Sequence, residues 1–274
     1  MNTRGNVVMA KERDLTALLL GDVCGNPGCR ALFIGLPQLI KRTRADIVVV
    51  NGENAAGGLG ITNELVRRFY SLGVHVITTG NHIWHQAEIL PTLESGDRLL
   101  RPANYPPGAP GTGYVIYEIA QHKVGVINLQ GRQQLPAIDC PFRTGLAIVE
   151  KIQKQTSIII VDFHAESTEE KEALAFYFDG KVSVVVGTHT HVQSADEKIL
   201  PKGTAYISDL GMTGPLNSVI GSDPAIAIQR QLTQMPLRNK ILDAPSYLQG
   251  VVCKIDPNTG KARSIERISE QFGF

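Results

Sequence analysis

The segment from Val182 to His191 constrains the fold of this chain more than any other. It reads Val-Ser-Val-Val-Val-Gly-Thr-His-Thr-His, an apolar and β-branched run that ends in two histidines. Such a run is typical of a strand that is covered on both faces. If the chain stays extended beyond Gly187, His189 and His191 point the same way, because side chains alternate in direction along a strand. Two imidazoles that face one point indicate a metal site.

Earlier apolar runs in the chain also end in polar residues. The predicted strands of this kind are 16–20, 47–50, 74–77 and 157–161. Helical segments are expected around them, at about 31–40, 62–72, 143–155 and 173–178. Strands that alternate with helices imply a largely parallel sheet, whose carboxyl edge is where sites are built. The residues with ligand chemistry at these strand ends are Asp22, Glu53, Asn54, Asn81, His82, His164, His189 and His191.

Some of the sheet is predicted to be antiparallel. The runs 114–119 and 123–129 alternate as the two strands of a hairpin do. The runs 250–255 and 262–268 form a second pair, and 204–207 is a further short strand. We therefore expect mixed sheets.

Local signals set the expected helix boundaries. The Gly- and Pro-containing stretch 21–28 is expected to form a turn, and Pro37 to kink the helix 31–40 or to mark its start. Ser167 and Glu170 match a capping box ahead of the helix that ends near residue 178. The pair Asp223-Pro224 marks another helix start.

The composition is that of a globular protein. The chain has 274 residues, 43% of them hydrophobic and 19% charged, enough for one large α/β domain or two small ones. The formal net charge of +1 provides no field that would draw it onto nucleic acid or an anionic membrane. No apolar run approaches the roughly 20 residues of a membrane span. We expect a cytoplasmic protein with one domain over 1–274, a polar extension at 1–14, and reduced cysteines.

The donor set at the strand ends narrows the choice of metal. Oxygen donors mixed with imidazoles, without a pair of thiolates, suit manganese, iron or zinc better than a structural zinc site. The candidates also exceed what one ion needs. Two adjacent ions that share a carboxylate are therefore the expected arrangement.

At these residues the chain resembles the calcineurin-like metallophosphoesterases. Gly80-Asn81-His82 and Gly187-Thr188-His189-Thr190-His191 carry the match. Four further motifs resemble the YmdB-type bacterial phosphodiesterases: Gly21-Asp22, Asn51-Gly52-Glu53-Asn54-Ala55-Ala56, Asp162-Phe163-His164-Ala165-Glu166 and Asp209-Leu210-Gly211-Met212-Thr213-Gly214. The resemblance spans about Leu18 to Ile268. It implies a two-sheet α/β-β/α sandwich with mixed sheets flanked by helices.

The resemblance also implies a role for each ligand. One metal would take Asp22, Glu53, Asn54 and His191, and the other Glu53, Asn81, His164 and His189, so that Glu53 bridges them. Most of the superfamily has Asp-x-His where this chain has Asp22-Val23-Cys24, so one expected imidazole is replaced by Cys24. The subfamily pattern implies iron, and manganese or zinc also suits these donors.

The expected reaction is hydrolysis of a phosphodiester. Two cations lower the pKa of a bridging water until hydroxide forms and attacks phosphorus, and His82 protonates the leaving oxygen. Asp162 is expected either to orient His164 or to cap the next element. Arg132, at another strand end, is a candidate for binding phosphate bidentately.

The resemblance favours small phosphodiesters such as 2′,3′-cyclic nucleotides as substrates, with phosphomonoesters next. A zinc amidohydrolase would place its H-x-H pair on the first strand of a barrel, which this order of motifs contradicts. A regulatory protein that binds RNA or a nucleotide without turnover is a further alternative, and His82 argues against it. The sequence is compatible with a homo-oligomer.

Overall fold

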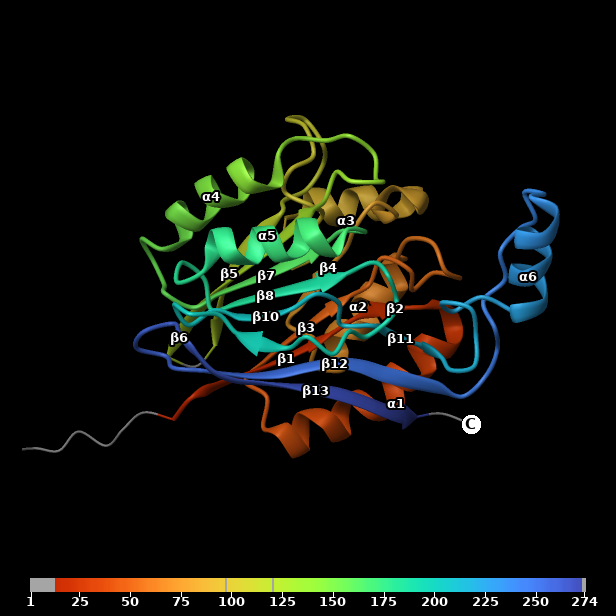
Figure 1. Ribbon diagram of the computed structural model, residues 1–274. Coiled ribbons are helices and arrows are strands. Elements are labelled where there is room, and N and C mark those ends of the chain that lie inside the picture. Colours follow the sequence, from red (N-terminus) through yellow and green to blue (C-terminus); the bar gives the residue numbers. More distant parts are fainter. Residues whose placement is uncertain (1–12, 97, 120, 273–274) are drawn as a thin grey trace, which may run out of the picture.

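Two β-sheets lie face to face, and helices cover both outer faces (Figure 1). The computed structural model describes residues 13–96, 98–119 and 121–272. Of the predicted polar extension, residues 1–12 lie outside this range. The architecture confirms the predicted sandwich of mixed sheets flanked by helices.

The first sheet has seven strands and contains the N-terminal part of the chain. Its strands, in spatial order, are β2 (Asp22–Val23), β11 (Met212–Pro215), β12 (Ser246–Ile255), β1 (Leu15–Leu20), β3 (Ile47–Asn51) and β4 (Val76–Thr78), with β13 (Ala262–Phe272) paired to β12. Strands β1, β3 and β4 are parallel, whereas β12 runs antiparallel to β1 and to β13. The predicted pairing of the two C-terminal strands is thus confirmed.

The second sheet has six strands. Their order is β5 (Tyr114–Ile119), β6 (His122–Gln130), β7 (Ile159–His164), β8 (Val184–Thr188), β10 (Ala205–Ile207) and β9 (Lys198–Ile199). The four central strands β6, β7, β8 and β10 are parallel, and the predicted hairpin of β5 with β6 is antiparallel. The parallel strands therefore end at one edge, as expected.

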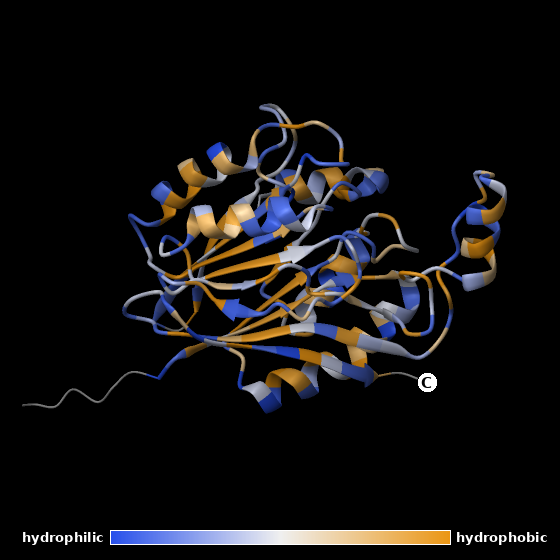
Figure 2. Ribbon diagram, in the orientation of Figure 1, coloured by the Kyte–Doolittle hydropathy of each residue, from blue (hydrophilic) through white to orange (hydrophobic). Residues whose placement is uncertain are grey.

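Alternating side chains divide the apolar residues into three layers. In β1, Leu18 and Leu20 face the helices, whereas Leu19 faces the second sheet and joins the same cluster as Val186. A third cluster lies between the second sheet and its own helices. Figure 2 shows the strands of both sheets as largely hydrophobic ribbons. The central strands of both sheets are buried on both faces and therefore read as continuous apolar runs, whereas the outer strands β5 and β13 are partly exposed.

Six α-helices surround the sheets in the described part of the chain. They are α1 (Gly25–Thr43), α2 (Asn63–Ser71), α3 (Leu90–Glu94), α4 (Pro141–Ile152), α5 (Thr168–Phe178) and α6 (Pro224–Thr233), with short 3₁₀ turns η1 (Ile83–His85) and η2 (Ala87–Ile89). Helices α1 and α2 pack on the first sheet, and α4 and α5 on the second. Helix α6 stands apart from the sandwich and buries none of its residues (Figure 1).

The predicted start of the first helix was wrong. The stretch 21–28 does not form a turn throughout, because α1 already begins at Gly25. Pro27 fits its first turn, where no N–H partner is needed. Pro37 lies inside α1 rather than at its start. Within the described residues, no helix combines the length and the apolar character that crossing a bilayer requires.

The predicted capping box is only half formed. The Ser167 hydroxyl caps α5 by accepting from the Glu170 N–H, at 3.2 Å. The Glu170 carboxylate instead accepts from the N–H groups of Arg132 and Gln133, after β6. A long-range contact thus takes the side chain that the local pattern assigned to the helix start.

Candidate metal centre

The ligand-type residues meet where the carboxyl ends of the two sheets come together. Asp22, Glu53 and Asn81 follow strands of the first sheet, whereas His164 ends β7 and His189 follows β8 in the second. The side chains of Glu53 and His164 are fully buried. The centre is therefore assembled from both halves of the sandwich.

His164 lies at the middle of one group of ligand atoms. Its Nε2 is 3.1 Å from Glu53 Oε1, 3.2 Å from Asn81 Oδ1 and 3.0 Å from His189 Nδ1. Ligand atoms of Glu53, His164 and His189 all lie within 4.8 Å of one another, a spacing suited to one metal ion. Gly80 leaves room for this approach, since a Cβ there would lie 2.1 Å from the His164 ring.

Hydrogen bonds on the far side of the ring set the tautomer of His164. The Thr188 hydroxyl donates to Asp162 Oδ1 at 2.8 Å, so its oxygen accepts from His164 Nδ1–H at 3.0 Å. Nε2 is then left with a lone pair that faces the Glu53 carboxylate. Asp162 thus reaches His164 through Thr188, and burial raises the pKa of Asp162 to about 6.

His189 also has one ring nitrogen held by a neighbouring group, but here Nε2 is the nitrogen that is held and Nδ1 the one that faces the ligand group. Its Nε2 is 3.1 Å from Glu166 Oε2, which leaves Nδ1 facing His164 Nε2. When both rings are neutral, two lone-pair nitrogens, a carboxylate and the amide oxygen of Asn81 converge on one buried point. Converging acceptors repel one another unless a cation lies between them. Burial opposes protonation, but the Glu53 carboxylate raises the pKa of His164, so a proton on Nε2 takes the place of an ion when none is bound.

The prediction that the chain stays extended through His191 was wrong. Strand β8 ends at Thr188, and His189 and His191 both adopt positive φ values, 106° and 65°. Side-chain carboxylates hold this turn: the His189 N–H donates to Asp22 Oδ2 at 3.1 Å, and the Thr190 N–H donates to Asp209 Oδ2 at 3.1 Å. Strained backbone of this kind is found where a fold must aim particular side chains.

The turn directs His191 into a second group of ligand-type residues. Its Nδ1 donates to the Ile220 carbonyl at 2.9 Å, and its Nε2 lies 2.9 Å from Asn54 Nδ2 and 4.0 Å from Asp22 Oδ1. Cys24 Sγ is 3.5 Å from the same ring, where the superfamily has an imidazole. Asp22 Oδ1 is buried and has no hydrogen-bond partner among the described residues, and burial raises the pKa of Asp22. An unpaired buried carboxylate oxygen is the kind of atom that a cation would satisfy.

His82 lies beside both groups. Its Nδ1 is 2.8 Å from Asn54 Oδ1 and 3.4 Å from Glu53 Oε1, and 27% of its side chain is exposed. It lines a cavity of about 430 Å³ that also contains Glu53, His189 and His191. The ring of His82, the predicted general acid, therefore lies between the ligand groups and the cavity.

Arg132 does not line this cavity. Its side chain is exposed, and its backbone N–H is bonded to Glu170. The arginine that lines the cavity is Arg238, from the loop after α6. Sequence reasoning missed Arg238, because a loop without periodicity carries no signal of where it folds back.

Two other contributors were missed but could have been found. Glu166 and Asp209 both lie within motifs that resemble the subfamily, yet neither was given a role. Asp209 is buried with Lys171, at 2.8 Å between Nζ and Oδ2. A carboxylate next to a predicted ligand histidine is a usable signal, because such groups often orient it.

The chain is similar to several known proteins over nearly its whole length. The 2′,3′-cyclic-nucleotide 2′-phosphodiesterase of Bacillus subtilis strain 168 is 45% identical over 251 residues, 92% of this chain and 95% of that protein. A crystal structure described as a novel phosphatase from Mycoplasma pneumoniae has 35% identity and a TM-score of 0.89, covering 94% of each chain. A hypothetical protein from Thermus thermophilus has 35% identity and a TM-score of 0.87, covering 94% of this chain and 99% of that one.

The predicted family relationship is thereby confirmed. The family described as YmdB-like protein matches residues 18–268, nearly the range over which the motifs suggested the resemblance. With this match and these relatives, the chain belongs to the YmdB-like protein family.

Proposed function

We propose that the protein is a dinuclear metal-dependent phosphodiesterase that hydrolyses small phosphodiesters, in the first place 2′,3′-cyclic nucleotides. The observation that carries this proposal is the pair of adjacent ligand groups that meet at the buried Glu53. The printed activity of the Bacillus subtilis relative, at 45% identity, supports the substrate class.

Two ions would be held by the residues that the motifs assigned. Asp22, Glu53, Asn54 and His191 would hold one, and Glu53, Asn81, His164 and His189 the other. The converging lone pairs of His164 and His189 and the unpaired Asp22 oxygen fit such ions. Asn54 would have to turn its amide, because its Nδ2 faces His191 and its Oδ1 faces His82.

The chemistry that the ions supply when bound is Lewis acidity, which offsets the charge of the phosphoryl oxygens and makes water more acidic. Iron is the metal we propose, with manganese and zinc as alternatives. Metal analysis of anaerobically purified protein decides among them.

His82 supplies the proton in this proposal. Its Nδ1 lies 2.8 Å from Asn54 Oδ1. Once the Asn54 amide has turned, its Nδ2 donates to His82 Nδ1, so that Nε2 carries the proton for the departing ribose oxygen. Imidazole suits this task because it exchanges protons near neutral pH. Leu59, Ile220 and Ile241 line the same cavity and give it apolar walls that limit the access of water.

Turnover by metal-loaded protein tests the proposal. We expect release of product from a 2′,3′-cyclic nucleotide and from bis-p-nitrophenyl phosphate. Absence of release from both substrates, with two metals bound, would instead support a binding protein without turnover.

A phosphomonoesterase is the second candidate, because the Mycoplasma pneumoniae relative is described as a phosphatase. Faster turnover of p-nitrophenyl phosphate than of the diesters would favour it.

A further inference from the structure

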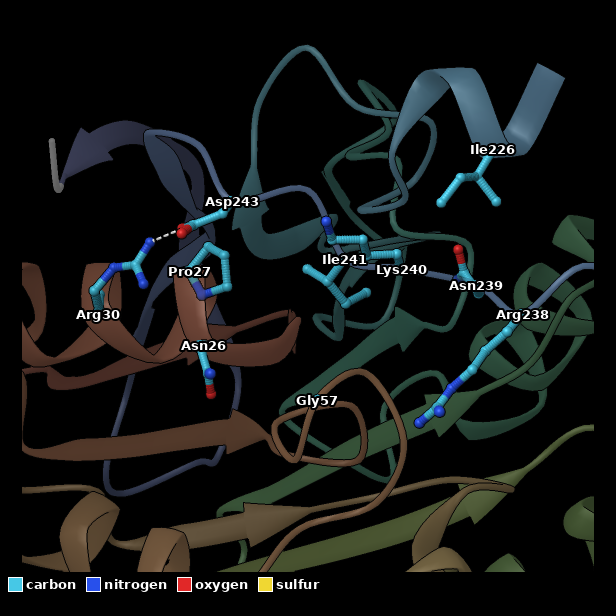
Figure 3. Close-up of a pocket in the computed structure, with 10 residues that line it drawn as sticks. All are labelled: Asn26, Pro27, Arg30, Gly57, Ile226, Arg238, Asn239, Lys240, Ile241 and Asp243. Carbon is cyan, nitrogen blue, oxygen red and sulfur yellow. Dashed lines mark hydrogen bonds and ion pairs between the residues drawn. The ribbon is translucent and has the colours of Figure 1, made fainter. Parts of the chain in front are cut away.

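A second cavity adjoins the one at the metal centre. Its volume is about 530 Å³, within the range of roughly 300–1,000 Å³ that is usual for small-molecule sites. The two cavities share four lining residues, Gly57, Arg238, Asn239 and Ile241. Figure 3 shows the second cavity between the start of α1, the Gly57 turn and the loop 238–243. A ligand at the metal centre can therefore extend past Arg238 into this space.

Positive charge distinguishes the second cavity from the first. The metal-centre cavity is lined by Glu53 and Glu166, and Arg238 is the only arginine or lysine among its described lining residues. The second cavity contains Arg238, Lys240 and Arg30. An anion that leaves the acidic centre thus meets cationic side chains on the other side of Arg238.

Ion pairing leaves two of these cations available. Arg30 is paired with Asp243, as the dashed line in Figure 3 shows. No side-chain hydrogen bond or ion pair engages Arg238 or Lys240 within the described residues, and both are exposed. The first turn of α1 lines the same cavity and has no acidic residue. The charge of this cavity is therefore not neutralised by the protein itself.

We propose that the second cavity binds the neighbouring phosphate of an oligonucleotide whose scissile phosphodiester lies at the metal centre, with Arg238 as the principal contact. This inference rests on the proposed phosphodiesterase function. The planar guanidinium of arginine donates two parallel hydrogen bonds to phosphate, and Lys240 adds a point charge. Ile226 and Ile241 provide apolar surface for the sugar or base between the two phosphates.

The proposal defines a substrate class. A 2′,3′-cyclic mononucleotide has one phosphate and leaves the second cavity empty. A short oligonucleotide that ends in a 2′,3′-cyclic phosphate fills both cavities. The enzyme should therefore favour the oligonucleotide through a lower KM rather than a higher kcat, since the extra phosphate is bound equally well before and during the reaction.

The test compares kcat/KM for a cyclic mononucleotide and for a dinucleotide that ends in a 2′,3′-cyclic phosphate. We expect Arg238→Ala to reduce the preference for the dinucleotide by up to about fivefold, the upper end for an exposed ion pair. Adding Lys240→Ala should bring the reduction to about tenfold. The dependence on salt should weaken as well, by a slope of about 0.7 for each single-strand phosphate that the variant no longer binds.

Two controls isolate the second phosphate. Arg230→Ala removes an exposed arginine of α6 that lines neither cavity, so it should leave the preference unchanged. With an uncharged methylphosphonate as the internal linkage, the dinucleotide should lose no more activity on Arg238→Ala than the cyclic mononucleotide does. An equal effect of Arg238→Ala on mononucleotide and dinucleotide, or no effect on either, would overturn the proposal.

Failure of the proposed function gives a different result. In that case metal-loaded wild-type protein turns over neither substrate. Binding of a fluorescent dinucleotide, measured by anisotropy with wild-type protein and Arg238→Ala, then still decides whether the second cavity holds a phosphate. Equal affinities of the wild-type protein and Arg238→Ala for the dinucleotide would refute the proposal that the second cavity binds a phosphate.

Discussion

Replacing Lys171 by methionine removes one half of a buried ion pair that supports the turn between His189 and His191. Lys171 and Asp209 are 1% and 4% exposed at their side chains, and their charged atoms are 2.8 Å apart. At an effective dielectric constant of about 20, two charges at this distance attract by about 6 kcal/mol. Much of this attraction only compensates for the free-energy cost of removing both charged groups from water. Removing one partner, however, leaves the other charge buried and unpaired.

We therefore expect Lys171→Met to lower the free energy of unfolding by about 3–5 kcal/mol. Asp209 keeps the N–H groups of Thr190 and Gly211, which satisfy only part of its charge. Without Lys171, the Asp209 carboxylate is expected to shift toward water, which would disturb the turn that it holds through Thr190, so metal affinity should also fall by about tenfold or more. Urea unfolding followed by far-UV circular dichroism measures the first effect, and metal titration measures the second.

A matched control distinguishes the effect of losing a buried ion pair from that of losing an exposed one. Lys198 pairs with Glu172 on the surface, with side chains 40% and 44% exposed. Lys198→Met should cost less than about 1 kcal/mol, as exposed pairs do. If Lys171→Met destabilises the protein no more than Lys198→Met, the reasoning about the buried pair is wrong.

Three further predictions concern the metal centre and the core. His82→Ala should retain two metals while kcat falls about 10²- to 10⁴-fold, and loss of both metals on elemental analysis would contradict its role as an acid. Thr188→Val removes the hydroxyl that accepts from His164 Nδ1 and should weaken metal binding about 10- to 100-fold by titration, whereas Thr188→Ser should restore it. Burial raises the pKa of the Cys29 thiol to about 12, so the unfolded chain loses this proton near pH 9 while the folded chain keeps it. Stability should then decline as the pH rises above about 9, and Cys29→Ala should reduce that decline in urea midpoints; equal declines in both proteins would exclude Cys29 as the cause.

The strands of the sandwich were predictable because their signal is local. The strand residues of runs such as 47–50 and 159–161 are buried on both faces, so their apolar character shows without any knowledge of their neighbours. Polar residues just after such runs indicated which side chains gather at the carboxyl edge. The short strands β2, β9 and β11, of two to four residues, were missed, because so few residues show no period.

The details that sequence could not provide depend on long-range contacts. The turn at His189 and Thr190 is held by Asp22 and Asp209, which lie 167 and 19 residues along the chain from the N–H groups that they accept. The Glu170 carboxylate bonds to N–H groups of residues 132 and 133 instead of its own helix start. Arg238 lines the cavity only because the loop after α6 folds back toward the metal centre. In each case the partner is fixed by the packing of the two sheets, which no local pattern reports.

The two sheets also meet in a polar contact beneath the metal centre. Asn51 of the first sheet donates to Asp162 of the second at 3.2 Å, and Thr78 donates to the same carboxylate. Above this contact, Glu53 comes from one sheet and His164 from the other. Ions bound there would cross-link the two halves of the sandwich, and an ion at 100 times its Kd would add about 2.7 kcal/mol of stability. Chelation should therefore lower the melting temperature as well as the activity, so that the same ions would serve both the reaction and the joining of the two sheets.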